Sequence, residues 1–273
     1  QDSAGQLTQR SSNDLRPIEV HSPPRDVQPL VSEINALFRR FANALENERR
    51  FTSAAAHELR TPLAAVKVHA QVAQLTRTAA ERKKALENLL LAIDRASHMV
   101  DQLLTLSRLD GMIALRTAAS PLRLDVIAGH VIDEVRPLLD RRSQRIEASL
   151  AACEIDGMEF GVASLLRNLI DNAMRYGPPA REIRVTVRPD DGHGLAVVED
   201  AGPGIPAEER ERVFERFYRL YGDGDGCGIG LSIVRTVAET HKAQIDLDAS
   251  ELGGLRVRVA FPKHTNPPTL TSP

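Results

Sequence analysis

The sequence predicts a multidomain protein in which an all-α helical hairpin is followed by an α+β sandwich. A helical pattern without a single glycine runs from Val31 to Leu75, and a second helical pattern follows over residues 80–110. Beyond residue 120, short strand patterns alternate with amphipathic helical patterns, which is typical of a sheet covered by helices on one face. The length of 273 residues is sufficient for two such parts, each with a core of its own.

The composition is that of an ordinary folded protein, with 42% apolar and 26% charged residues. The net charge of -2 gives no indication of a nucleic-acid partner. Cys153 and Cys227 lie far apart, which favours a reduced compartment over a disulfide scaffold or a metal cluster. No stretch reaches the ~18 apolar residues of a membrane span. The loop-like opening nevertheless leads us to expect that this chain belongs to a longer protein.

Residues 1–31 are rich in Ser, Pro and Gln and are predicted to form a linker. The following helix would be ~65 Å long and therefore needs partners along its length. The second helical pattern repeats apolar residues at coiled-coil spacing and is expected to end at Asp110-Gly111, because glycine suits a helix C-terminus. One hairpin cannot bury its own apolar face, so we expect a homodimer that forms a four-helix bundle.

The first helix contains the stretch His57-Glu58-Leu59-Arg60-Thr61-Pro62-Leu63. Its apolar stripe passes through Ala55 and Leu59, and at ~100° per residue His57 points away from that stripe towards solvent. Glu58 and Thr61 follow one and four residues later. An exposed imidazole beside a carboxylate contributes little stability, but it can act as a nucleophile with a base.

The second part of the chain is predicted to contain four helices and six short strands. The final tail, residues 263–273, is expected to be disordered. The predicted helices cover residues 125–139, 160–176, 208–215 and 231–241, and the predicted strands cover residues 122–124, 145–151, 183–188, 195–200 and the pair 244–249 and 255–261.

Polar motifs in this part favour a phosphate-containing ligand. Asn168 and Asn172 lie four residues apart on one helix face, and amide oxygens suit Mg²⁺. Arg175, one turn further on, could meet an anion. Asp200 ends a strand before the loop Ala201-Gly202-Pro203-Gly204, where it offers acceptors for an amine. The glycines at 226, 228 and 230 open into a helix, whose first N–H groups attract phosphate.

Five motifs in order, HELRTPL, NLIDNAMRY, DAGPGIP, FERFYR and GCGIGLSIV, resemble those of the sensor histidine kinases of bacterial two-component systems. The resemblance covers residues 51–240. It implies a dimerisation and histidine phosphotransfer domain over residues 32–110 and a catalytic ATP-binding domain over residues 111–262, of the GHKL (Bergerat) type found in Hsp90, gyrase and MutL. Residues 1–31 are similar to the end of a HAMP linker. The resemblance further implies a cytoplasmic fragment of an inner-membrane protein, anchored through a region that precedes this chain.

The resemblance also implies a role for each matching residue. His57 would be the phosphoacceptor, Glu58 its base, and Thr61 the residue that positions water in a phosphatase reaction. Asn168 would hold Mg²⁺. The residues implied to bind ATP are Asn172 and Arg175 at the phosphates, Tyr176, Asp200, Gly202 and Gly204 around the adenine, and Gly226, Gly228 and Gly230 in the phosphate lid.

The predicted activity is therefore ATP-dependent autophosphorylation of His57, followed by transfer of the phosphoryl group to an aspartate in the receiver domain of a response regulator. Two alternatives remain open from the sequence. One is an ATPase or conformational clamp of the same fold that does not phosphorylate histidine. The other is a non-catalytic dimeric relay whose glycine loops are hinges. The other histidines, among them His98 and His241, are assigned to packing or to the surface.

Overall fold

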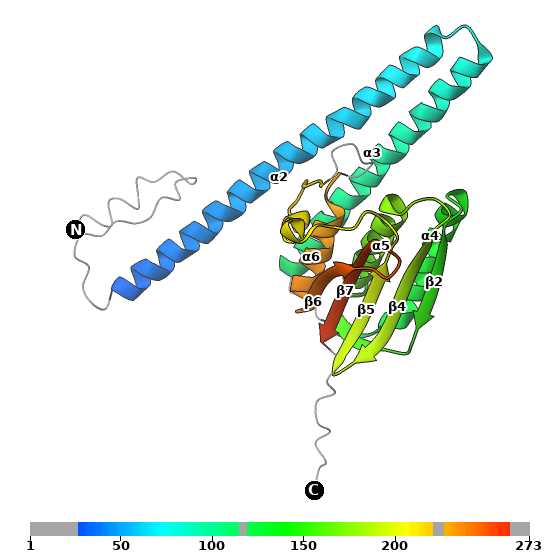
Figure 1. Ribbon diagram of the computed structural model, residues 1–273. Coiled ribbons are helices and arrows are strands. Elements are labelled where there is room, and N and C mark those ends of the chain that lie inside the picture. The colour runs from blue at the N-terminus through cyan, green and yellow to red at the C-terminus, as the bar shows by residue number, and fades with distance from the viewer. Residues whose placement is uncertain (1–26, 115–118, 221–226, 263–273) are drawn as a thin grey trace, which may run out of the picture. The chain divides into compact units, whose positions relative to one another are not determined.

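The structure is a computed structural model that describes residues 27–114, 119–220 and 227–262 (Figure 1). Most of the predicted linker and the predicted C-terminal tail lie outside the described residues, as does Gly226. The chain divides into two compact units, residues 1–61 and residues 62–273. Within the described residues, no helix combines the length and the apolar character that crossing a bilayer requires.

Two long helices open the described chain, as the periodicity predicts. Helix α2 spans Gln28–Leu75 and contains Pro62, and helix α3 spans Ala79–Ala114. Thr78 and Glu81 cap the start of α3 reciprocally: the Glu81 N–H donates to the Thr78 hydroxyl at 3.2 Å, and that hydroxyl donates to the Glu81 carboxylate at 2.7 Å. The predicted helix end at Asp110-Gly111 is wrong, because α3 continues through Gly111. Glycine inside a helix costs only ~1 kcal/mol, so one glycine does not force an end.

A five-stranded sheet with the order β2-β4-β5-β7-β6 forms the centre of the second part. Strands β2 and β4 pair in parallel, and all the other neighbours pair antiparallel. A separate two-stranded ladder pairs β1 with β3. The strand bounds are β1 (Ser120–Arg123), β2 (Arg145–Leu150), β3 (Glu154–Gly157), β4 (Glu182–Asp190), β5 (His193–Glu199), β6 (Gln244–Ala249) and β7 (Leu255–Pro262).

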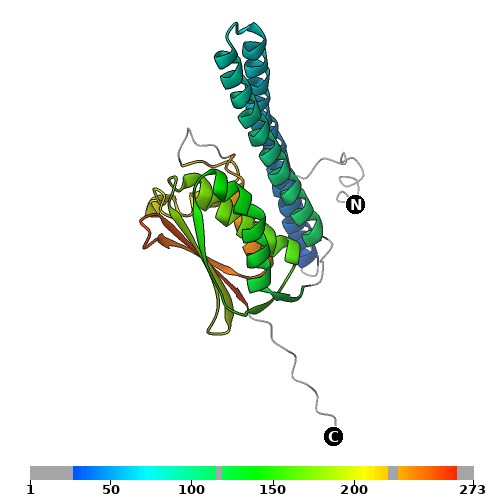
Figure 2. The same ribbon diagram turned by 90° about the vertical axis from the view of Figure 1, so that its right-hand side faces the viewer.

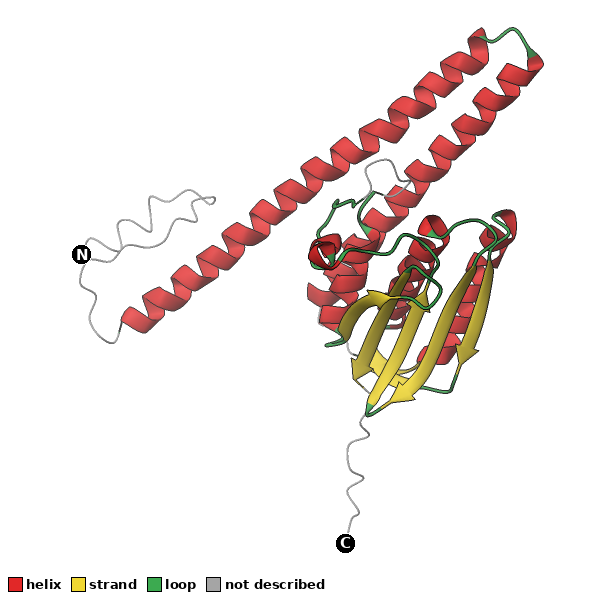
Figure 3. Cartoon of the chain, in the orientation of Figure 1, coloured by secondary structure: helices red, strands yellow, loops and turns green. Residues whose placement is uncertain are grey.

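Three helices, α4 (Leu124–Arg141), α5 (Glu159–Tyr176) and α6 (Gly230–Thr240), cover one face of this sheet (Figures 2 and 3). Alternate residues of the strands supply the other half of the core; in β4 these are Ile183, Val185 and Val187, each at most 1% exposed. The α+β sandwich predicted from the sequence is thus confirmed. The arrangement leaves the C-terminal end of α5, the end of β5 and the start of α6 available for one site.

Two local predictions differ from the structure. The charged helix expected over residues 208–215 is replaced by two short 3₁₀ turns, Ala207–Glu209 and Arg212–Phe214. In these two turns only Val213 is buried, so the segment has no apolar stripe that could stabilise a longer helix. Strand β3 was not expected, because Ile155 is its one large apolar residue and a single apolar position shows no alternation.

Candidate functional site

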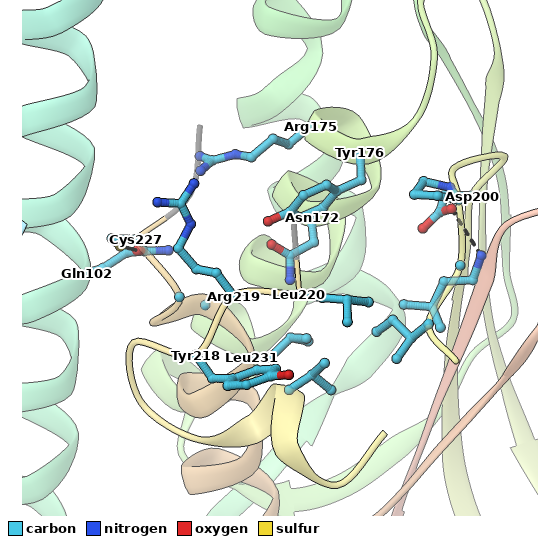
Figure 4. Close-up of a pocket in the computed structure, with 17 residues that line it drawn as sticks. Gln102, Asn172, Arg175, Tyr176, Asp200, Tyr218, Arg219, Leu220, Cys227 and Leu231 are labelled. Carbon is cyan, nitrogen blue, oxygen red and sulfur yellow. Dashed lines mark hydrogen bonds between the residues drawn. The ribbon is translucent and has the colours of Figure 1, made fainter. Parts of the chain in front are cut away.

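A pocket of about 800 Å³, counting its opening to solvent, lies within the unit formed by residues 62–273. Figure 4 shows Asp200 at one end of it and Arg175, Arg219, Gln102 and Cys227 towards the other. The pocket therefore has a carboxylate at one end and two guanidinium groups at the other. Its lining residues are Gln102, Asn172, Arg175, Tyr176, Asp200, Pro203, Gly204, Ile205, Val213, Tyr218, Arg219, Leu220, Cys227, Gly228, Gly230, Leu231 and Leu255.

Asp200, directly after β5, is only 7% exposed. Its Oδ1 accepts hydrogen bonds from the backbone N–H groups of Gly202 at 2.8 Å and Leu255 at 3.0 Å. Burial raises the pKa of this carboxyl, and the two N–H groups partly offset that rise. Both bonds end on Oδ1, so Oδ2 is available as an acceptor for a ligand amine, with apolar groups of Ile205 and Leu255 nearby in the lining.

Two glycines permit this close arrangement around Asp200. A Cβ at Gly202 would lie 2.8 Å from the Tyr176 carbonyl oxygen, at the end of α5. A Cβ at Gly254 would lie 2.2 Å from Asp200 Oδ1 and 2.3 Å from the Gly202 nitrogen. Any larger residue at position 254 would push the loop off the carboxylate. Gly254 is thus a residue of the site that the sequence analysis did not single out, although the pair Gly253-Gly254 before β7 was an available signal.

Amide side chains and a helix start meet at the other end of the site. A Cβ at Gly230, the first residue of α6, would lie 3.0 Å from Asn168 Oδ1 and 3.5 Å from Asn172 Oδ1. Two amide oxygens thus face one small region beside a helix N-terminus and the pocket residue Arg175. Oxygen ligands suit a hard divalent cation, while the helix start and the guanidinium suit phosphate.

In the glycine segment, residues 227–230, Gly228 lies against the loop residues Phe217 and Tyr218. It has φ +70, and a Cβ there would lie 2.6 Å from the Tyr218 carbonyl oxygen. The Phe217 N–H donates to the Gly228 carbonyl at 2.9 Å, and Phe217 itself has φ 64. Tyr218 is fixed in turn, because its hydroxyl donates to Glu209 at 2.5 Å and Arg212 lies over its ring at 4.5 Å. These contacts hold Phe217 and Tyr218 against Gly228.

His57, Glu58 and Thr61 lie in the other unit, residues 1–61. On α2, Ala55 is 8% exposed whereas His57 is exposed, as the periodicity predicts. Glu58 is half-buried and Thr61 is exposed. In this unit taken by itself, the side chain of His57 is therefore exposed and accessible to a reaction partner.

The structure brings most of the predicted binding residues to one pocket. Asn172, Arg175, Tyr176, Asp200, Gly204, Gly228 and Gly230 line it, while Gly202 and Asn168 contact lining residues. Gly226 falls outside the described residues. Gln102 on α3 also lines the pocket, which the sequence analysis missed, because a glutamine on an amphipathic helix gives no local signal of a distant contact.

Two family models match the chain. The model described as "His Kinase A (phospho-acceptor) domain" matches residues 47–111, and the model described as "Histidine kinase-, DNA gyrase B-, and HSP90-like ATPase" matches residues 157–265. The first covers the His57 stretch and most of α3. The second covers α5, the Asp200 loop, the glycine segment and α6, which together form most of the pocket.

Curated relatives match almost the whole chain. Sensor protein QseC of Escherichia coli K12 is 39% identical over 258 residues, which are 93% of this chain and 57% of QseC. Sensor protein kinase PmrB of Pseudomonas aeruginosa is 37% identical over 94% of this chain and 54% of PmrB. Sensor protein BasS of Escherichia coli K12 is 33% identical over 94% of this chain and 70% of BasS. The chain thus spans little more than half the length of QseC and PmrB.

Among solved structures, the Acinetobacter baumannii histidine kinase AdeS has a TM-score of 0.57 at 22% identity, over 77% of this chain and 98% of that chain. At this identity the likeness concerns the fold.

Proposed function

Because the chain belongs to the sensor histidine kinases of bacterial two-component systems, we propose that it uses ATP to phosphorylate its own His57 and passes the phosphoryl group to an aspartate of a response regulator. The observation that carries this proposal is the pocket, which pairs a buried acceptor, Asp200, with arginines, amide oxygens and a helix start at its other end. ATP has the complementary arrangement, with the amino group of its base at one end and its phosphates at the other.

In this pocket Asp200 Oδ2 accepts a hydrogen bond from the adenine amino group, with Gly202 and Gly204 shaping the loop around the base and Tyr176 bordering it. Asn172 and Arg175 contact the phosphates. The glycines at 226, 228 and 230 let the lid backbone approach them closely, and the N-terminus of α6 adds its N–H groups.

Asn168 is the residue that would hold Mg²⁺, and its Oδ1 faces the same small region as Asn172 Oδ1, which fits an oxygen-liganded cation. When bound, Mg²⁺ neutralises charge on the phosphate oxygens. The protein otherwise contributes alignment and further positive charge, which is most of what phosphoryl transfer requires.

The chemical step starts from a neutral ring of His57. One ring nitrogen attacks the γ-phosphorus, and a nitrogen–phosphorus bond forms as the bond to the β,γ-bridging oxygen breaks, so ADP leaves with that electron pair. Glu58 accepts the proton from the other ring nitrogen. An aspartate oxygen of the response regulator then attacks the phosphorus and displaces the imidazole. Thr61 positions water when the protein acts as a phosphatase.

The proposed working unit is a homodimer held by a four-helix bundle. On α3 five apolar residues are spaced by four, three, seven and four positions, and each is at least 42% exposed: Leu86, Leu90, Ile93, Val100 and Leu104. Such a seam in coiled-coil register requires a partner, and a second copy offers a matching one.

We place the dimerisation and phosphotransfer domain at residues 32–110 and the ATP-binding domain at residues 111–262, between a linker at 1–31 and a tail at 263–273. Since the chain spans 57% of QseC, we also propose that it is the cytoplasmic part of an inner-membrane sensor.

The test is incubation of the whole chain with Mg²⁺ and ATP labelled at the γ-phosphate. We expect label on the protein that is lost in acid and stable in base, and none on a His57→Gln variant that still binds ATP. His69→Gln on the same helix is the matched control and should be labelled like the wild type. Normal labelling of His57→Gln would refute the phosphoacceptor assignment, and ATP hydrolysis without labelled protein would favour a conformational clamp.

A further inference from the structure

Helix α3 reaches the nucleotide pocket through the side chain of Gln102, which is 9% exposed. Its Nε2 donates to Asn168 Oδ1 at 3.0 Å, and its Oε1 accepts from the Cys227 thiol at 2.7 Å. Asn168 is itself fixed, because its Nδ2 donates to the Ser164 carbonyl at 2.8 Å. One glutamine therefore connects α5 with the glycine segment and uses both ends of its amide to do so.

The Gln102 side chain donates a hydrogen bond to Asn168 Oδ1, the oxygen that would otherwise bind the cation. Mg²⁺ binds oxygen ligands at ~2.1 Å and repels the positive end of a neighbouring N–H dipole. Asn168 Oδ1 already accepts a hydrogen bond from Gln102 Nε2 at 3.0 Å. A Cβ built on Gly230, which faces the same region, would lie 3.4 Å from that nitrogen. The donor and a metal ion compete for one place.

A second contact accompanies the first one helical turn away. His98 Nε2 lies 3.4 Å from Asp171 Oδ2, and both side chains are partly buried. His98 and Gln102 are four apart on α3, while Asp171 and Asn168 are three apart on α5, so the two pairs lie along one helix-to-helix contact. Helix α3 is thus docked against α5, and Gln102 is the residue of α3 that enters the pocket.

We propose that Gln102 is a residue of the nucleotide site supplied by α3, and that it occupies Asn168 in place of Mg²⁺, so that docking of α3 and binding of Mg²⁺-bound ATP exclude each other. This rests on the proposed role of Asn168. Nucleotide without the cation needs no change at Asn168 and is affected little. A movement of α3 that withdraws Gln102 frees the metal ligand, which gives the helix that follows the His57 helix direct control over ATP binding.

The test compares the affinity for the ATP analogue AMPPNP with Mg²⁺ and with EDTA, by calorimetry on the whole chain. In Gln102→Ala the gain in affinity that Mg²⁺ confers should rise about five- to tenfold, as expected for removal of a competing buried hydrogen bond. Gln102→Glu, which replaces the donor by an oxygen, should raise that gain further. Alanine and glutamate both suit a helix, so neither change threatens α3.

Thr105→Ala is the matched control on the same helix, because its hydroxyl donates to the backbone of α3 itself at 2.8 Å, and it should bind like the wild type. An unchanged Mg²⁺ gain in both Gln102 variants, together with its loss in Asn168→Ala, would overturn the competition and leave the proposed metal ligand standing. If Mg²⁺ altered affinity in none of the wild type, the two Gln102 variants and Asn168→Ala, the metal role and the competition would fall together.

Discussion

Replacing Asp200 separates its two functions, which the structure and the proposed mode of binding assign to different oxygens. Oδ1 holds the backbone N–H groups of Gly202 and Leu255, and Oδ2 is the acceptor proposed for adenine. The Asp200→Asn variant would keep an oxygen for the backbone and present an NH₂ group to the ligand. The Asp200→Ala variant would leave both buried N–H groups without this acceptor. The two variants together therefore distinguish ligand binding from folding.

The expected magnitudes follow from the bonds that are lost. A hydrogen bond to a charged group contributes ~1.5–3 kcal/mol. In the Asp200→Asn variant the new NH₂ group would face the adenine amino group, so two donors would replace the hydrogen bond. ATP affinity should therefore fall by about 2–3 kcal/mol, or ~30- to 150-fold. Stability should change by less than ~1 kcal/mol, because the backbone acceptor is kept. Asp200→Ala should lose about 2–6 kcal/mol of stability, at ~1–3 kcal/mol for each of the two buried N–H groups left without an acceptor.

Calorimetric titration with ATP and unfolding in urea measure the two effects on the same preparations. If the Asp200→Asn variant bound ATP as tightly as the wild type, the assignment of Oδ2 to adenine would be refuted. If the Asp200→Ala variant were as stable as the wild type, the structural role of Oδ1 would be refuted.

Two further predictions concern the lid and the core. Gly228→Ala adds a Cβ 2.6 Å from the Tyr218 carbonyl oxygen at φ +70, so ATP affinity should fall about tenfold. Gly192→Ala is the control, because Gly192 also has a positive φ but open space around its Cβ position. It should lower stability and leave ATP binding unchanged. Burial lowers the pKa of His241, whose Nε2 accepts from the Met158 N–H at 2.9 Å. The unfolded chain therefore binds more protons below about pH 6.5, and the free energy of unfolding should fall from pH 7.5 to 5.5, less so in His241→Gln. A lid variant with normal ATP affinity, or a pH dependence unaffected by His241→Gln, would contradict these assignments.

The helices and strands were predictable from the sequence wherever a periodic apolar pattern ended at a clear signal. Helix α5 has a strong stripe and stops at Gly177-Pro178, and the break between α2 and α3 coincides with the capping pair Thr78 and Glu81. Gly111 misled the prediction, because a glycine can sit inside a helix when no capping geometry forms around it. The charged segment over 208–215 lacked a stripe, so local composition could not decide its form.

The residues of the pocket were predictable to the extent that their own neighbourhood is unusual. Two asparagines on one helix face and three glycines before a helix are poor choices for a core, and that conflict pointed to a ligand. Gln102 and Gly254 could not be found in this way. Their importance comes from contacts with Asn168 and Asp200, at sequence separations of 66 and 54 residues, and such contacts leave no trace in the local pattern.

The most direct test of the account is to identify the phosphorylated residue after the wild-type chain has reacted with Mg²⁺ and ATP, by mass spectrometry under neutral or alkaline conditions. The account predicts a phosphoryl group on the His57 ring and its disappearance when a receiver domain with an accepting aspartate is added. Phosphate on another side chain, or ATP consumption that leaves the protein unmodified, would contradict it.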